Sequence, residues 1–143
     1  MSAITAKMMA MIAIFDQPDQ VAPMVEDFYA ESAVFRDPVQ TVRGRDDIKK
    51  MFRSFTRLFK TVETDVIDVI EDDSRCVIHW EMTFVYRRWP AAATIKGVTW
   101  LELNEQGQCV SHTDYWDLWK FFRGSMPFGA LKRLPGRIKS LFA

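Results

Sequence analysis

The sequence predicts an α+β domain in which three N-terminal helices cover one face of an antiparallel sheet. Up to about residue 59, apolar residues recur at helical spacing, and from Thr61 onward they alternate with a period of two. Helices that precede a run of strands in this way pack together on one face of the sheet. With 143 residues and a hydrophobic content of 48%, the chain is long enough for one domain and too short for two ordinary ones. We therefore treat residues 1–143 as a single domain.

Three helical patterns occupy the N-terminal part of the chain. Residues 4–15 place apolar side chains at helical spacing. A second helix is expected to open near Asp19, with Pro23 in its first turn, and to break at residues 30–32. The third begins after Gly44, where two aspartates favour the positive end of the helix dipole. Its apolar stripe consists of Ile48, Met51, Phe52, Phe55, Leu58 and Phe59.

Extended segments make up most of the remainder. A short piece at residues 33–38 lies between the second and third helices and is stopped by Pro38. After the third helix, alternating apolar and polar residues bounded by turn-forming residues predict strands at 61–71, 75–88, 94–104 and 109–117.

Several classes of protein are disfavoured by composition. No apolar run reaches the length of a membrane span, and the apolar N-terminal segment is interrupted by Lys7 and followed by Asp16 instead of a cleavage site. We therefore expect a cytoplasmic protein. The two cysteines and two histidines match no zinc or redox spacing, so we expect no metal and no cofactor. Strand alternation places Cys109 on the face opposite His112 and Cys76 on the face of Trp80, so we expect free thiols.

The net charge of zero conceals an asymmetry. All 19 acidic residues and 13 of the 19 lysines and arginines precede residue 118, so the body carries −6 and the tail +6. A whole-surface nucleic-acid partner is therefore not expected. The basic, amphipathic tail at 120–143 has two interpretations. It is either a lid over a cavity or an interfacial helix that docks on an anionic membrane surface, although Pro127, Pro135 and Gly136 interrupt it.

Residues 109–117 carry the densest group of chemically active side chains. Alternation along a strand points Val110, His112, Asp114 and Trp116 to one face. The Cα atoms of His112 and Asp114 are then about 7 Å apart, so one ligand or one water can contact both side chains. In an apolar cavity a carboxylate can be tuned as a general acid or base. The structural alternative is that Asp114 bonds backbone or a tryptophan N–H and that His112 is a hydrogen-bonded core residue.

Three motifs coincide with those of a known superfamily. They are FYAESA at 28–33 at the end of a helix, FRDP at 35–38, and VRGRDDI at 42–48, with long strands after them. Over about residues 4–119 the chain is similar to the superfamily of nuclear transport factor 2, ketosteroid isomerase, limonene epoxide hydrolase and the SnoaL-like polyketide cyclases. The DYWD ending at 114–117 with its basic tail resembles a bacterial subgroup of it. The resemblance implies a cone-shaped α+β barrel, whose strongly curved sheet wraps around a deep apolar cavity closed by the helices.

The resemblance also implies site residues. The isomerases keep their general base at the position of Asp37, and the cyclases and epoxide hydrolases use a last-strand carboxylate that corresponds to Asp114. Two departures disfavour steroid isomerisation. Thr99 stands where the isomerases have an oxyanion-hole aspartic acid, and the tyrosine of that hole is missing near Ala13. The structural alternative for Asp37 is a turn residue whose carboxylate caps the local backbone.

Strand parity divides the remaining apolar residues between two faces. The cavity wall that would bind a ligand comprises Trp80, Met82, Phe84, Gly97, Thr99, Leu101 and Trp116. Gly97 in this wall leaves space for a flat or branched apolar ligand. The outer face carries Val77, His79, Val85, Val98, Trp100 and Tyr115. Because this outer surface is too apolar to leave in water, we expect a homodimer through it, as the superfamily commonly forms.

Two functions fit these expectations. The first is cofactor-free acid/base chemistry, of isomerase, cyclase or epoxide hydrolase type, on an apolar oxygenated molecule such as a polyketide, terpenoid, steroid or lipid-like compound. In it Asp114 is the principal acid or base, His112 its partner, Asp37 an assistant from across the cavity, and Thr99 a hydrogen-bond donor or acceptor. The second is a non-catalytic carrier or sensor with the same pocket.

Overall fold

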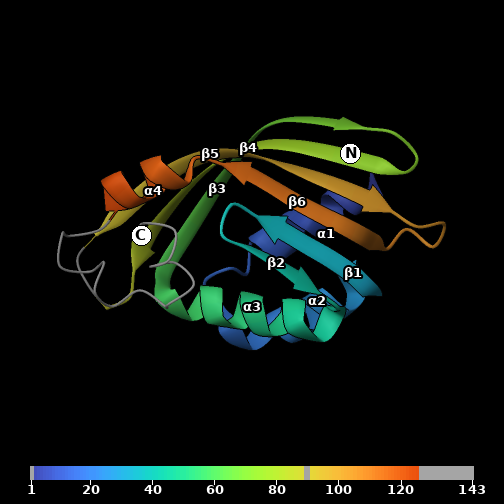
Figure 1. The fold of residues 1–143 in the computed structure, drawn as a ribbon, viewed down its shortest axis with the longest axis horizontal. Helices are drawn as coiled ribbons and strands as arrows, with labels where there is room; N and C mark the ends of the chain where they lie inside the picture. Colours follow the sequence, from blue (N-terminus) through green and yellow to red (C-terminus); the bar gives the residue numbers. More distant parts are fainter. Residues whose placement is uncertain (1, 89–90, 126–143) are drawn as a thin grey trace.

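The computed structural model describes residues 2–88 and 91–125 (Figure 1). In chain order its elements are α1 (Ala3–Ile12), the short 3-10 helix η1 (Pro18–Gln20), α2 (Val21–Phe28), β1 (Tyr29–Asp37), β2 (Gln40–Arg43), α3 (Arg45–Leu58), β3 (Phe59–Glu71), β4 (Arg75–Tyr86), β5 (Ala92–Leu103), β6 (Cys109–Trp116) and α4 (Leu118–Ser125). The predicted α+β class is confirmed. Within the described residues, no helix has both the length and the apolar character needed to cross a membrane.

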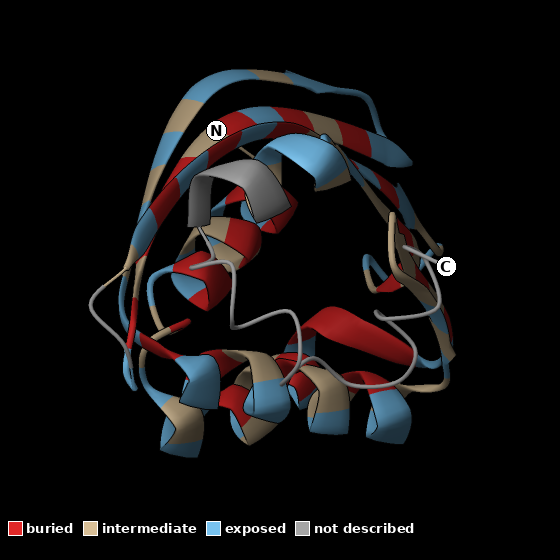
Figure 2. Cartoon of the chain, turned by 60° about the vertical axis from the view of Figure 1, so that its left-hand side comes forward, coloured by how far each residue is buried: buried red, intermediate tan, exposed pale blue. Residues whose placement is uncertain are grey.

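The strands form one six-stranded sheet in the order β2-β1-β6-β5-β4-β3. Neighbouring strands run antiparallel, except that β1 and β6 are parallel. The sheet curves strongly around the helices, as the resemblance implied (Figure 2). It does not close into a barrel, because its edge strands β2 and β3 do not pair with each other. Helix α3, which joins these two strands in the chain, contacts both of them.

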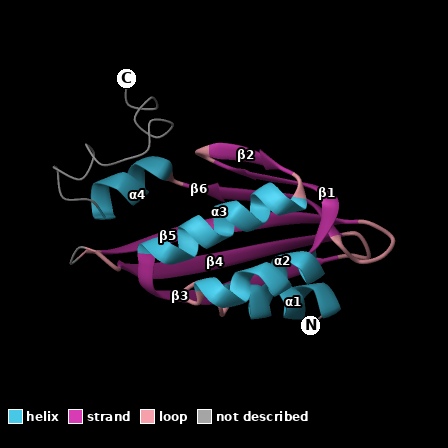
Figure 3. Cartoon of the chain, turned by 90° about the horizontal axis from the view of Figure 1, so that it is seen from below, coloured by secondary structure: helices cyan, strands magenta, loops and turns pink. Residues whose placement is uncertain are grey.

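The concave face of the sheet carries most of the core. Side chains alternate between buried and less buried positions along β4 and β5, in agreement with the predicted period of two. The buried side of β4 consists of Cys76, Ile78, Trp80, Met82, Phe84 and Tyr86. Helices α1, α2 and α3 lie across this face (Figure 3), and the residues they bury include Met8, Val25, Phe28, Ile48 and Phe52.

Local interactions fix where two of these helices begin. Gly44 precedes α3 with φ of 89°, a conformation that favours glycine, and the aspartates of the first turn suit the helix dipole. At α1 the hydroxyl of Ser2 accepts a hydrogen bond from the amide of Thr5. Glu71, at the end of β3, accepts from the amide of Ser2 at 3.0 Å and from the hydroxyl of Thr5 at 2.6 Å. The start of α1 is therefore tied to the sheet.

The elements between α2 and α3 differ from the sequence-based expectation. The second helix ends at Phe28, and β1 starts at Tyr29 instead of at residue 33. We expected no strand at residues 40–43, but these residues form β2, which pairs with β1 in a register that sets Asp37 opposite Gln40. Both differences have a tertiary cause, because β1 pairs with the distant strand β6 and gains ladder hydrogen bonds that local propensity does not reveal.

Two further expectations about faces are corrected. Leu58, expected in the apolar stripe of α3, is 50% exposed, because it is the last residue of the helix and lines the open cavity instead of the packed core. Cys109 was expected opposite His112, but its register partner is Leu103, whereas Ser111 pairs with Glu102. The extra residue forms a bulge that turns Cys109 into the core. Both cysteines are nevertheless free thiols, as expected.

The basic tail can be followed only in part. Residues 118–125 form α4, and Phe121 packs against Phe84 and Trp116 with ring centroids 5.4 and 5.5 Å apart. Residues 126–143 lie outside the described part of the chain, and so do most of the basic residues on which the lid and membrane interpretations depend.

Candidate active site

A cavity of about 810 Å³ lies between the helices and the concave face of the sheet. Its walls are largely aromatic and are drawn from Phe15, Phe35, Phe52, Phe55, Phe59, Trp80, Phe84, Trp116 and Phe121. The exposed charged residues Arg43, Asp47 and Lys50 also line it. The less exposed polar residues in its lining include Asp37, Thr99, His112 and Asp114. A few polar groups in a mainly apolar hollow are the usual composition of a small-molecule site.

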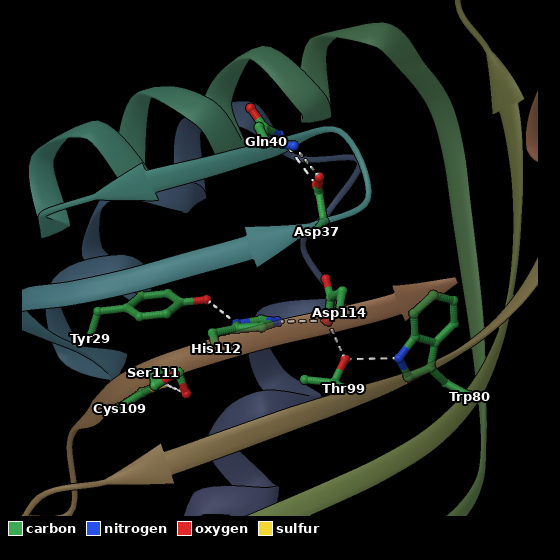
Figure 4. A network of polar contacts seen from close by, with 9 residues as sticks. All are labelled: Tyr29, Asp37, Gln40, Trp80, Thr99, Cys109, Ser111, His112 and Asp114. Atoms are coloured by element: carbon green, nitrogen blue, oxygen red, sulfur yellow. Dashed lines mark hydrogen bonds and ion pairs between the residues drawn. The ribbon is translucent and has the colours of Figure 1, made fainter. Parts of the chain in front are cut away.

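Asp114 is held on one side by two neighbours (Figure 4). Its Oδ1 atom accepts a hydrogen bond from the Thr99 hydroxyl at 2.6 Å and lies 2.8 Å from Nε2 of His112. The register explains the first contact, because Thr99 and Asp114 are directly opposite each other on β5 and β6. The Asp114 side chain is 19% exposed. Within residues 2–88 and 91–125, Oδ2 has no hydrogen-bond partner, so this oxygen remains available to a ligand.

The hydrogen bonds continue beyond these residues in both directions. The indole Nε1 of Trp80 donates to the Thr99 hydroxyl at 2.8 Å. The hydroxyl of Tyr29 lies 2.6 Å from Nδ1 of His112. A chain of five side chains therefore runs through Tyr29, His112, Asp114, Thr99 and Trp80 (Figure 4) and draws on strands β1, β6, β5 and β4. Such a network fixes the orientation of each member more firmly than a single bond would.

Asp37 lies at the end of β1 and is engaged by its own turn. Its Oδ1 accepts from the amides of Val39 and Gln40 at 2.8 and 3.0 Å, and Oδ2 accepts from the Gln40 side chain at 3.3 Å. Burial raises the pKa of the Asp37 carboxyl, and the charge of nearby Asp114 raises it further, whereas these hydrogen bonds oppose the shift. Asp37 therefore caps its own turn, as the structural alternative expected, and also lines the cavity.

The ligand-wall residues predicted from parity fall into two groups. Trp80, Met82, Phe84, Thr99 and Trp116 line the cavity. Leu101 is fully buried on the same face, but it is not among the described residues that line the cavity. Gly97 was expected to leave space for a ligand, but that space is occupied by Trp80, whose ring atoms would lie 2.4 and 2.5 Å from a Cβ at this position. Gly97 therefore shapes the site by admitting the indole.

Sequence reasoning missed Tyr29. It was assigned to a helix end, and only its position in β1, which is parallel to β6, brings its hydroxyl to His112. Phe121, an apolar residue of the tail for which a lid over the cavity was one interpretation, lines the cavity. In the described residues, no three His, Cys, Asp or Glu side chains gather as a metal ion would require.

A curved sheet closed by helices around an apolar cavity with a few acidic groups defines the class of cone-shaped α+β proteins named above. The model of the family called SnoaL-like domain matches residues 9–112, more than half of the chain. The chain belongs to this family, and the resemblance to the nuclear transport factor 2-like superfamily is confirmed. The sequence matches no curated protein.

Solved structures agree with this assignment at the level of the fold. An NTF2-like protein of Burkholderia pseudomallei superposes with a TM-score of 0.74 at 18% identity, covering 89% of this chain and 100% of its own. A protein of ketosteroid isomerase-like fold from Catenulispora acidiphila, in complex with trimethylamine, gives 0.72 at 15%, with 85% and 93% covered. An LEH-like epoxide hydrolase of M. tuberculosis gives 0.69 at 14%, with 85% and 87% covered.

Proposed function

We propose that this protein binds an apolar, oxygenated small molecule in the cavity and performs acid/base chemistry on it without a cofactor. One observation carries this proposal. Oδ1 of Asp114 is held by Thr99 and His112, while Oδ2 has no partner among the described residues, in the wall of an aromatic cavity. A carboxylate fixed in this way can exchange a proton with a bound molecule. Asp114 is then the principal acid or base, and His112 and Thr99 orient it.

The composition of the cavity supports the substrate class. Its volume of about 810 Å³ lies in the range of small-molecule sites, and its walls are mainly aromatic. Asp37 and Asp114 offer polar contacts to one or two oxygen atoms of a ligand. A polyketide, terpenoid, steroid or lipid-like scaffold with few oxygens suits such a hollow. The reaction would be of isomerase, cyclase or epoxide hydrolase type, with Asp37 assisting from β1.

A non-catalytic carrier or sensor is the second candidate. It is favoured by the hydrogen bonds of Asp37, because three contacts from its own turn satisfy that carboxylate without any ligand. A carrier needs the same apolar walls but no proton transfer. The two candidates therefore agree on binding and differ on the role of Asp114.

The test begins with a panel that holds a cyclic epoxide, an unsaturated cyclic ketone and a linear poly-keto ester. Turnover of each is followed by mass spectrometry with the unaltered protein, with Asp114→Asn and with Asp117→Asn. Asp117 provides the matched control, since it is exposed and caps α4 through the amide of Lys120, which asparagine also does. We expect Asp114→Asn alone to lose turnover, by about 10²- to 10⁴-fold. Equal turnover by both variants would contradict the proposed role of Asp114.

We further propose a homodimer formed through the outer face of the sheet. Trp100 and Tyr115 are 40% and 61% exposed on this face and are supported by half-buried Val77 and Val98. Analytical ultracentrifugation should show a dimer that Tyr115→Lys weakens, and a monomer at all concentrations would exclude it. A cytoplasmic location is proposed as well, supported by the free thiols of Cys76 and Cys109.

A further inference from the structure

We propose that Tyr29 is a positioning residue of this site. Its hydroxyl holds His112 in the neutral tautomer that carries the proton on Nε2, and so aims that N–H at Oδ1 of Asp114. The catalytic consequence rests on the proposed function, whereas the tautomer itself does not.

The geometry leaves Tyr29 and His112 little freedom. The two residues are 0% and 1% exposed, and 2.6 Å separates the tyrosine oxygen from Nδ1. The two rings are stacked with centroids 5.9 Å apart and an angle of 16° between their planes. Phe35 contacts the imidazole edge-on, with centroids 4.7 Å apart. In the described residues, the hydrogen-bond partners of the imidazole are the Tyr29 hydroxyl at Nδ1 and the Asp114 carboxylate at Nε2.

The direction of the hydrogen bonds follows from the far end of the network. An indole N–H can only donate, so Trp80 donates to the Thr99 oxygen, and the Thr99 hydroxyl in turn donates to Oδ1 of Asp114. Oδ1 is thus an acceptor, and Nε2 of His112 must be a donor to it. Burial raises the pKa of the Tyr29 hydroxyl well above its usual value, so this group keeps its proton. Because Nδ1 is the one hydrogen-bond partner of this buried hydroxyl in the described residues, the O–H is satisfied only by donating to it, so Nδ1 is an acceptor and the imidazole carries its proton on Nε2.

The other ionisable groups near this pair come from β1, β6 and α3. Asp37 ends β1, and Cys109 begins β6, where burial raises the pKa of its thiol to about 12. On the side of α3, uncharged Phe52 packs against the Tyr29 ring, and Arg45 donates to the backbone carbonyl of Tyr29 at 3.4 Å, not to its hydroxyl. In the described residues no lysine or arginine forms an ion pair with Asp114, whose partner of this kind is His112 itself. Oδ1 of Asp114 therefore keeps the proton of His112 on Nε2, and the Tyr29 hydroxyl keeps Nδ1 unprotonated.

Removal of this hydroxyl has a definite chemical consequence. In Tyr29→Phe no hydrogen bond stabilises the unprotonated Nδ1, so this nitrogen can gain a proton, while Nε2 keeps its own proton because Oδ1 of Asp114 still accepts from it. His112 would then be a cation paired with Asp114. The positive charge beside Asp114 would weaken this carboxylate as a base.

The test is nitrogen NMR of histidine in the full chain. The sequence holds two histidines, so exposed His79 provides an internal reference for His112. In the unaltered protein at neutral pH we expect His112 as the Nε2–H tautomer, and in Tyr29→Phe a measurable share of the ring protonated on both nitrogens. Tyr115→Phe removes a tyrosine hydroxyl from the outer face and is the matched control. A tautomer mixture in the unaltered protein overturns the proposal even if Tyr29→Phe fails to fold, and so does a spectrum that Tyr29→Phe leaves unchanged.

Turnover separates this inference from the proposed function. For any panel substrate that is converted, Tyr29→Phe should lower kcat by about 10- to 100-fold, the effect usual for groups that orient a functional histidine, with KM little changed. A protonation change at Nδ1 in Tyr29→Phe without any turnover, even in the unaltered protein, contradicts the proposed function but supports the role of Tyr29 in fixing His112. A protonation change at Nδ1 with full kcat overturns its role in catalysis.

Discussion

The indole ring of Trp80 lies directly over Gly97, its register partner on the neighbouring strand. A Cβ at position 97 would be 2.4 Å from the ring and 2.9 Å from the backbone oxygen of Tyr115. This close approach sets the ring where its N–H reaches Thr99. One glycine on β5 therefore determines how the hydrogen-bond network of the site begins.

We expect Gly97→Ala to destabilise the fold by about 1–3 kcal/mol, because neither the packed indole nor the backbone oxygen can move without strain. Urea unfolding of Gly97→Ala, Trp80→Phe and the double variant measures this. The smaller phenyl ring relieves part of the overlap, so the cost of the alanine should be lower in the Trp80→Phe background. The same cost in both backgrounds would show that the indole is not what position 97 accommodates.

Thr99 joins two halves of the network, and Thr99→Val removes its hydroxyl at nearly constant volume. The substitution leaves the Trp80 N–H without an acceptor and takes one donor from Asp114. We expect a loss of about 1–3 kcal/mol in the free energy of unfolding. Thr99→Ser keeps the hydroxyl and provides the control, which should retain most of this energy. The hydrogen-bond network has no energetic role if valine is tolerated as well as serine.

Asp37 should make stability depend on pH. Burial raises the pKa of its carboxyl in the folded protein above the ordinary 3.8, so the folded state binds the proton more tightly than the unfolded state does. The free-energy penalty of burying the charged carboxylate is absent below pH 3.8. It grows as the pH rises from 3.8 toward the raised pKa and is complete above that pKa. Asp37→Asn removes it while preserving an oxygen for the turn. Its stability relative to the unaltered protein should therefore increase with pH.

Unfolding curves at several pH values measure this trend. Asp73→Asn, on the exposed turn between β3 and β4, provides the control substitution. A stability gain of Asp37→Asn over the unaltered protein that stays constant over this pH range, or that shrinks as the pH rises, would contradict the raised pKa of Asp37.

Both cysteines should be unreactive in the folded protein. Burial raises the pKa of the Cys109 thiol to about 12 and also raises that of Cys76, so little thiolate exists at pH 8 and reagents cannot reach it. A thiol reagent such as DTNB should titrate neither cysteine until denaturant is added, and both afterwards. Rapid reaction of one thiol without denaturant would show that its burial is incomplete.

The alternation of residues predicted much of this site, and long-range pairing decided the rest. His112, Asp114 and Thr99 share a face because the period of two is uninterrupted at these positions, and this is visible in the sequence. The bulge at the start of β6 inverts the face of Cys109, and it arises from the register with β5. Tyr29 joins the network only because β1 pairs with β6, a contact between residues 83 positions apart that local patterns do not encode.

The role of Asp114 is tested most directly by the affinity of Asp114→Asn for a panel molecule that the unaltered protein converts. Isothermal titration calorimetry gives the Kd of that molecule for Asp114→Asn, beside Asp117→Asn as control. If Asp114 acts on the proton and the aromatic walls supply binding, the Kd should stay within about threefold while turnover falls by about 10²-fold or more. A Kd weakened in proportion to the lost turnover would contradict this, because Asp114 would then serve only to bind.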